Sequence, residues 1–499
     1  MKNVRSRLLK GAIWLSGARL ATNLLATIST LVLARLLLPS DFGLVALGTT
    51  TLSILTSITN ISLSEALVQH RDPSPHHYHT VWTLNLLRGI LIGSVFALIA
   101  VPAARYYSDY RLEDVMFALS GSAILNGLEN PRAIMLVKQL IFWQQFMLQV
   151  SQKLVALIAS VLIAVIYHSY WALIGGILLG QLVGVLVSYT VLPFRPTFSI
   201  AHVRDLLSFS IWLTLCEAIN TINWNFDQLL VGKFIGKTAL GYYTVGNNLA
   251  VMPSREATAP LTGTLFPAFS NLADDPVRLA AAYQRAQTLV TAIALPAGVG
   301  MALIADPLVR LAMGEKWLPA VLVIRILAAV FAFQTFGSLA QPLAMAAGRT
   351  QLLFKRDLQA FLYRVPLVIV GLYFGGFAGV LYARAVMGTT VLFFNTNVVT
   401  KVTGLSLWQQ IRPNMRAVAS VLLMTVVLAP MEALSDKGSS QWAIALSLGV
   451  LIVTGAVAYG AATLILWRVM GRPEGPETEV VQVTSKVWRS FLPVKNLPG

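Results

Sequence analysis

The sequence predicts an all-α, polytopic membrane protein of about 14 transmembrane helices, built as two six-helix lobes plus two extra helices. Hydrophobic residues make up 56% of the 499 positions and charged residues only 12%, whereas charged residues usually make up about a quarter of a soluble protein. Apolar runs of about 20 residues, long enough to cross a bilayer core, recur along the whole chain. An internal repeat then arranges these runs in two halves.

The repeat begins at Ile13, and the stretch up to Gly48 recurs 198 positions later without a gap. The matching positions are Ile13–Leu15 and Ile211–Leu213, Leu31 and Leu229, Arg35 and Lys233, Gly43 and Gly241, and Gly48 and Gly246. An offset of six spans gives both repeats the same orientation. This implies two lobes related by a pseudo-twofold axis along the membrane normal.

The predicted spans follow the apolar runs in order. They are residues 13–36, 42–67, 80–103, 113–131, 146–167, 171–194, 206–232, 240–265, 284–305, 318–343, 358–375, 377–399, 415–432 and 441–467. We therefore predict an N-terminal lobe at 1–198, a C-terminal lobe at 199–403, a helix pair at 404–468 and a polar cytoplasmic tail at 469–499.

The distribution of lysine and arginine predicts the orientation in the membrane. With this set of spans, and with basic residues at the very end of a span counted with the nearer side, 22 of the 37 basic residues lie on the side of the N-terminus, 8 on the opposite side and 7 within spans. The positive-inside rule then makes both termini cytoplasmic. Because the basic residues are dispersed between apolar spans, the net charge of +16 indicates a membrane protein and no nucleic-acid partner.

Polar side chains recur at helical spacing on one face of four predicted spans. The candidates for lining a substrate-binding cavity are Arg19, Asn23, Asn60, Glu217, Asn225, Asn248 and Arg255. A charge facing lipid near the bilayer centre costs about 2.5–3.5 kcal/mol on insertion scales, so such groups should face protein or water. The alternative for the amides is hydrogen bonding between helices.

An arginine in a narrow cavity suits an anionic ligand, because its planar guanidinium holds phosphate oxygens with two hydrogen bonds and stays charged. The repeat places Glu217 at the position that corresponds to Arg19. The two could form an ion pair that the ligand opens, give the lobes different tasks, or form a simple salt bridge. Glu217 and Asp227 are the candidates for ion coupling. The sequence holds no nucleotide-binding GxxxxGK[ST] motif, and we expect no cofactor and no metal.

Several stretches together resemble the polysaccharide flippases of the multidrug/oligosaccharidyl-lipid/polysaccharide export superfamily. They are Ala34–Gly43, Asn225–Gly236 with Ala239–Tyr243, Leu265–Ser270 and Ala305–Trp317. The resemblance implies transfer of an undecaprenyl-diphosphate-linked oligosaccharide from the cytoplasmic to the outer leaflet of a bacterial inner membrane. It also implies alternating access, a cationic cavity at Arg19 and Arg255, contact with membrane lipids, and polysaccharide polymerase or export proteins as candidate partners.

Three other functions compete with this interpretation. A cation-coupled multidrug exporter of the same superfamily would rely on the acids Glu217 and Asp227. A lipid II flippase for peptidoglycan would differ only in the sugars it carries. A membrane polymerase or glycosyltransferase would need paired carboxylates on a sizeable outer loop, and the loops between the predicted spans are too short for that. We therefore expect a transporter without enzymatic activity.

Overall fold

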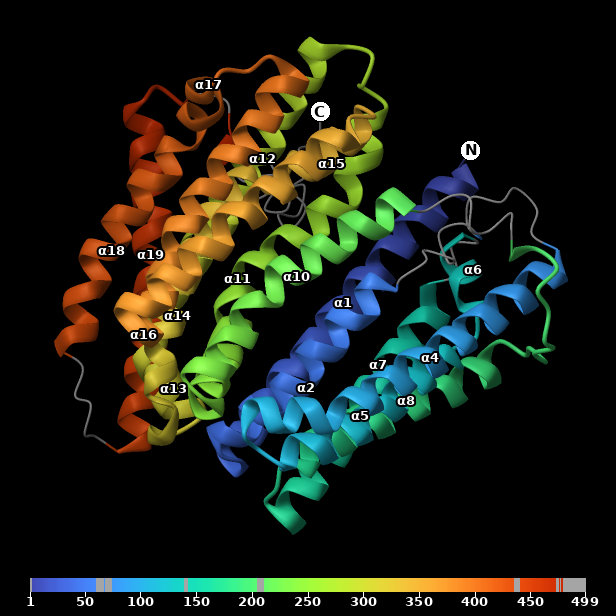
Figure 1. Ribbon diagram of the computed structural model, residues 1–499. Helices are drawn as coiled ribbons and strands as arrows, with labels where there is room; N and C mark the ends of the chain where they lie inside the picture. The colour runs from blue at the N-terminus through green and yellow to red at the C-terminus, as the bar shows by residue number, and fades with distance from the viewer. Residues whose placement is uncertain are drawn as a thin grey trace, which may run out of the picture. The chain divides into compact units, whose positions relative to one another are not determined.

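The computed structural model describes residues 2–59, 67, 74–138, 142–203, 211–434, 440–472, 475, 477 and 478, and every regular element within these ranges is helical (Figure 1). Most of the predicted tail lies outside the described residues. The chain divides into two compact units, of which the first contains Met1–Gly246, Ala312–Ala320 and Arg364–Val380. The second contains Asn247–Leu311, Val321–Tyr363 and Leu381–Gly499. The lobe boundaries at 198 and 403, drawn from the sequence repeat, stay a prediction.

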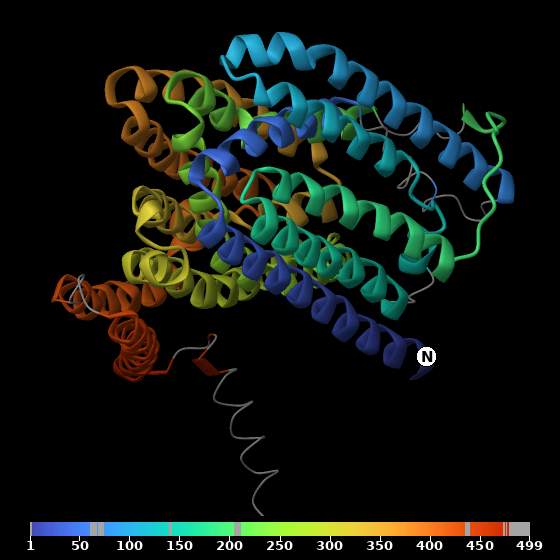
Figure 2. The same ribbon diagram turned by 90° about the horizontal axis from the view of Figure 1, so that it is seen from below.

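The first unit is a bundle of long helices. These are α1 (Lys2–Leu36), α2 (Pro39–Ile58), α4 (Pro75–Tyr107), α5 (Arg111–Gly127), α6 (Ala133–Lys138), α7 (Phe142–Tyr167), α8 (Trp171–Val191), α10 (Ile211–Phe234) and the start of α11 (Lys237–Ser270). Within it, α7 packs against α1 and α8, α4 packs against α5, and α2 packs against α5 and α10 (Figures 1 and 2). A 3-10 helix, η1 (Glu315–Trp317), also belongs to this unit.

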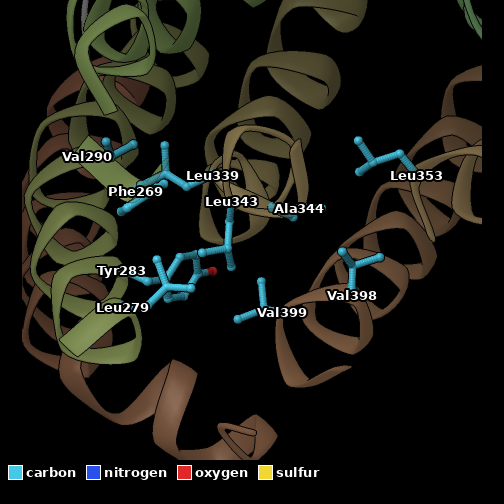
Figure 3. Close-up of a cluster of buried hydrophobic side chains, with 11 residues drawn as sticks. Phe269, Leu279, Tyr283, Val290, Leu339, Leu343, Ala344, Leu353, Val398 and Val399 are labelled. Carbon is cyan, nitrogen blue, oxygen red and sulfur yellow. The ribbon is translucent and has the colours of Figure 1, made fainter. Parts of the chain in front are cut away.

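The second unit holds the rest of α11 and the helices after it. They are α12 (Pro276–Leu303), α13 (Ala305–Ala312, whose last residue belongs to the first unit), α14 (Pro319–Gln334, whose first two residues belong to the first unit), η2 (Thr335–Gly337), α15 (Ala340–Ala346), α16 (Thr350–Thr403, of which Arg364–Val380 belongs to the first unit), α17 (Leu407–Ile411), η3 (Arg412–Asn414), α18 (Met415–Leu434) and α19 (Gln441–Val469). One core joins Phe269, Tyr283, Leu343 and Val399 from α11, α12, α15 and α16 (Figure 3). A second core holds α18 against α12.

Each of the predicted spans overlaps a helix of the structure. Among the described residues, ten helical stretches are long and apolar enough to cross a membrane, which confirms the polytopic helical fold class. The spans predicted at 358–375 and 377–399 both lie on α16, whose backbone leaves the helical conformation between them at Gly376, with a φ of 53° and a ψ of −130°. The spans predicted on α5, α10 and α11 fall outside the ten stretches, so the count of fourteen crossings stays a prediction.

The two repeated turns contact each other through their matched glycines. A Cβ on Gly43 would lie 1.7 Å from the carbonyl oxygen of Lys237, and a Cβ on Gly241 would lie 1.9 Å from that of Pro39. The first turns of α2 and α11 therefore touch backbone to backbone, which only glycine allows. The glycines that recur 198 positions apart in the sequence thus form one reciprocal contact inside the first unit.

The segment before α14 packs onto the same place. The Trp317 indole N–H donates to the carbonyl oxygen of Ala34 at 2.8 Å, and Lys316 Nζ donates to the carbonyls of Arg35 and Leu37, both at 2.8 Å. These carbonyls lie at the end of α1, where backbone oxygens have no partner within the helix. The Phe42 and Trp317 rings pack edge to face, with their centroids 5.1 Å apart. We call the contacts among residues 34–43, 237–243 and 312–317 the turn assembly.

Candidate functional site

The polar face of α1 begins with two of the predicted site residues. Arg19 is exposed and Asn23 is half-buried, one helical turn further along. The Asn23 carbonyl accepts a hydrogen bond from the Thr27 hydroxyl at 2.8 Å, within the same helix. Asn60, which was placed on the same predicted cavity, lies outside the described residues.

The polar face of α10 has two different parts. Glu217 is exposed near the start of the helix. Asn225 instead belongs to a network: its Nδ2 donates to the Thr221 carbonyl at 2.9 Å, and its Oδ1 accepts from Gln228 at 3.4 Å. The hydroxyl of Thr50 on α2 donates to Gln228 Oε1 at 2.9 Å. Asn225 therefore supports a hydrogen-bond link between α2 and α10, the second of the two roles that the sequence allowed.

Asp227 is fully buried and tightly paired. Arg364 donates to both carboxylate oxygens of Asp227, from Nε at 3.1 Å and from Nη2 at 2.6 Å, and the Tyr243 hydroxyl donates to Oδ2 at 2.8 Å. Arg364 also donates to Asn223 Oδ1 at 3.3 Å. This bidentate geometry is the strong form of an arginine–carboxylate pair. The two paired residues are 137 positions apart, and no local sequence pattern predicts their contact.

The remaining predicted residues lie on the part of α11 that belongs to the second unit. Both Asn248 and Arg255 are exposed. Ser254, between them in the sequence, is buried against α12: a Cβ added to Gly298 of α12 would lie 3.0 Å from the Ser254 hydroxyl oxygen. The helix thus buries one face and exposes the face with the arginine. The joint action of Arg19 and Arg255 on one ligand stays a prediction.

An ionic cluster ties the start of α11 to the turn between α4 and α5. Asp109 accepts hydrogen bonds from Arg111, with Nε at 3.2 Å, and from Lys237. Although burial alone would raise the pKa of Asp109, these hydrogen bonds lower it from 3.8 to about 2. The cluster stays charged at neutral pH and borders the turn assembly.

Two pockets lie inside the first unit. The first, of about 360 Å³, lies among α1, α2, α7 and α8, and its lining includes Gln152, Lys153 and Gln181 besides serine, threonine and apolar side chains. The second, of about 430 Å³, lies among α2, α4, α5 and the start of α7. Its polar lining includes Arg88, which donates to the Thr56 carbonyl at 3.1 Å. None of these residues is among the sites predicted from the sequence, although Asn85 and Arg88 lie three residues apart and therefore share the helix face that lines the second pocket.

A model of the polysaccharide biosynthesis protein family matches residues 32–322, which is more than half of the chain. The chain belongs to this family. The matched region contains the whole turn assembly together with Arg255, Asn248 and the polar faces of α2 and α10.

Among the relatives of this polysaccharide biosynthesis protein is the lipopolysaccharide biosynthesis protein WzxC of Escherichia coli (strain K12), which is 26% identical over 76% of the chain and 78% of the relative. The succinoglycan biosynthesis transport protein ExoT of Rhizobium meliloti (strain 1021) is 24% identical over 57% of the chain and 58% of the relative. The lipid II flippase MurJ, in its inward closed conformation, shares the fold with a TM-score of 0.74 at 13% identity, covering 92% of this chain and 99% of that one. The protein is thus a multi-pass membrane protein with a transporter fold.

Proposed function

We propose that this polysaccharide biosynthesis protein is a flippase for an undecaprenyl-diphosphate-linked oligosaccharide, which it moves from the cytoplasmic to the outer leaflet of the bacterial inner membrane. The match to the polysaccharide biosynthesis family carries the proposal, together with relatives named for lipopolysaccharide biosynthesis and succinoglycan transport. The oligosaccharide would then serve exopolysaccharide or lipopolysaccharide assembly.

The proposed mechanism assigns the charged head group to exposed cations. Arg19 on α1 and Arg255 on α11 each present a guanidinium at the depth of a predicted span, and such a group can hold diphosphate oxygens with two hydrogen bonds. The lipid tail stays in the bilayer while the head group crosses. Alternating access of the two lobes, with both chain termini on the cytoplasmic side, completes the cycle without a chemical step.

The buried acid on α10 argues against the competing drug exporter. Coupling to a cation requires a carboxylate that can give up its partner. Asp227 has no exposed surface, and the carboxylate already accepts three hydrogen bonds, two of them from Arg364. Separating such a buried pair leaves a charge without compensation, which costs about 3–5 kcal/mol. Glu217 is the remaining candidate for coupling to an ion.

Deleting the gene and analysing the membrane lipids tests the proposal. We expect an undecaprenyl-diphosphate-linked repeat unit to build up on the cytoplasmic face, and expression of the chain to clear it. Accumulation of lipid II instead would assign the chain to peptidoglycan. A lipid profile that does not change would contradict the flippase function.

A further inference from the structure

The second pocket of the first unit has the composition of a binding site. It measures about 430 Å³, within the usual range of about 300–1,000 Å³ for ligand pockets. We call it the amide pocket after its polar lining. That lining consists of Thr56, Asn85, Arg88, Asn126, Glu129, Asn130 and Gln145.

Glycines bring the two main walls of the amide pocket together. A Cβ on Gly89 would lie 2.6 Å from the carbonyl oxygen of Ala123, and a Cβ on Gly127 would lie 2.6 Å from that of Asn85. Helices α4 and α5 therefore touch along their backbones at the pocket. This close contact sets Asn85 and Asn126 on adjoining walls of one cavity.

The charges around the amide pocket balance each other. Arg88 is the cation of the lining, and Glu129 lies in the same lining. Glu217 of α10 also attracts Arg88 electrostatically. A phosphate group would meet one guanidinium, Arg88, and one acidic side chain, Glu129, so the pocket gives little preference to an anion. A neutral group rich in hydroxyls suits it better.

An unused hydrogen-bond acceptor points to such a ligand. Within the described residues, the Gln145 Oε1 atom is buried and accepts no hydrogen bond. A buried acceptor without a donor costs about 1–3 kcal/mol, and a ligand hydroxyl would remove that cost. Asn130, by contrast, is fully used: its Nδ2 donates to the carbonyls of Ser188 and Leu192, and its Oδ1 accepts from the Arg132 amide.

We infer that the amide pocket binds a sugar ring of the lipid-linked oligosaccharide, an inference that rests on the proposed function. Each sugar hydroxyl both donates and accepts a hydrogen bond, and a side-chain amide likewise offers both a donor and an acceptor. A guanidinium and a carboxylate can each bind two neighbouring hydroxyls, and Ile92 and Ile134 line the pocket where the apolar face of the ring can pack.

Cysteine labelling tests the inference on the full-length protein. Cys216 is the single native cysteine, so Cys216→Ser gives a background for Asn126→Cys, whose side chain is exposed in the pocket lining. A water-soluble thiol reagent is applied with undecaprenyl-diphosphate-linked repeat unit from the deletion strain, or with undecaprenyl diphosphate that carries no sugar. At about ten times the dissociation constant the sugar-bearing lipid should slow labelling about tenfold.

The bare lipid should leave the labelling rate of Asn126→Cys unchanged. The control Tyr110→Cys, at the exposed start of α5, should label at the same rate with either lipid. Equal protection of Asn126→Cys by both lipids, or protection by neither, would overturn the inference. If the repeat unit accumulates in the deletion strain while labelling is unaffected, the sugar pocket fails and the flippase function stands.

A second variant separates binding from folding. Gln145→Leu keeps the volume of the side chain and removes the acceptor without a donor, so the melting temperature should hold or rise. The concentration of repeat-unit lipid needed for half-protection should rise about tenfold or more, the factor that corresponds to about 1.4 kcal/mol. Gln181→Leu makes the same change at an equally unpartnered acceptor in the other pocket and should leave protection unchanged. Unaltered protection in Gln145→Leu would contradict the sugar site.

Discussion

Charged side chains within the predicted spans fall into two groups that differ in their surroundings. Asp227 and Arg364 are buried and bonded to each other, and Arg384 is buried 5.8 Å from the ring of Phe331. Arg19 and Arg255 are exposed. A buried charge that is already compensated holds helices together, whereas an exposed charge at membrane depth suits a ligand. Burial, which the sequence does not report, separates the two roles.

Breaking the buried pair should give the largest effect. Arg364→Ala leaves the Asp227 carboxylate buried without its cation, so the free energy of unfolding should fall by about 3–5 kcal/mol. Chemical denaturation of the purified protein measures this loss. Arg325→Ala is the matched control, because exposed Arg325 pairs with half-buried Glu432 at 2.7 Å, and breaking this pair should cost less than breaking the fully buried one. Equal losses in both variants would remove the distinction between the groups.

The turn assembly should respond next. Gly241→Ala adds a Cβ whose ideal position lies 1.9 Å from the carbonyl oxygen of Pro39. The two turns must therefore separate. Such overpacking should lower the free energy of unfolding by about 1–3 kcal/mol, which a lower thermal unfolding temperature would reveal. Gly449→Ala has no atom within 4 Å of the new Cβ and should be neutral or stabilising, since alanine favours a helix more than glycine. A stable Gly241→Ala protein would mean that the two turns do not touch this closely.

Replacing the buried indole of the turn assembly by a smaller ring should give a change of similar size. Trp317→Phe keeps an aromatic ring against Phe42 but removes the N–H that donates to the Ala34 carbonyl at 2.8 Å. The free energy of unfolding should fall by about 1–3 kcal/mol, because the fully buried ring becomes smaller and the Ala34 carbonyl loses this donor. No change in the denaturation midpoint would show that the bond contributes nothing.

The ionic cluster at Asp109 should give the smallest effect, and one that depends on pH. Its pKa is about 2 in the folded protein against 3.8 ordinarily, so the charged form stabilises the fold above pH 3.8. The contribution, about 0–1 kcal/mol for a partly exposed pair, is lost as the pH falls through 2. Wild type and Asp109→Asn should therefore differ in unfolding free energy at pH 6 and converge at low pH. A difference that grows as the pH falls would reverse the sign.

The sequence predicted the positions of the helices better than the roles of their polar residues. Apolar runs located a helix at each predicted span, because the length and hydropathy of a membrane helix are local properties. The repeat also marked Gly43 and Gly241, which the structure joins. Helical spacing alone could not separate Asn225, which bonds to Gln228 within a link between helices, from the exposed Asn248.

Contacts between distant helices explain what the sequence missed. Arg364 was recognised as a charge within a span, but its partner lies on α10, which only packing reveals. The sequence did not reveal the amide pocket for the same reason, because Asn85, Asn126 and Gln145 come from three different helices, α4, α5 and α7, that only tertiary packing brings around one cavity. A side chain's partner depends on tertiary packing, which one sequence does not encode in any local pattern.

The most direct test measures surface polysaccharide in cells that carry Arg255→Ala in place of the native chain, at equal amounts of membrane protein. We predict a loss of about tenfold or more, since one charge-assisted hydrogen bond is worth about 1.5–3 kcal/mol, with an unchanged melting temperature of the purified variant. Arg278→Ala, an exposed arginine paired with Asp275 at the start of α12, should export normally. Normal export by Arg255→Ala would contradict the assignment of the exposed arginine to the lipid-linked substrate.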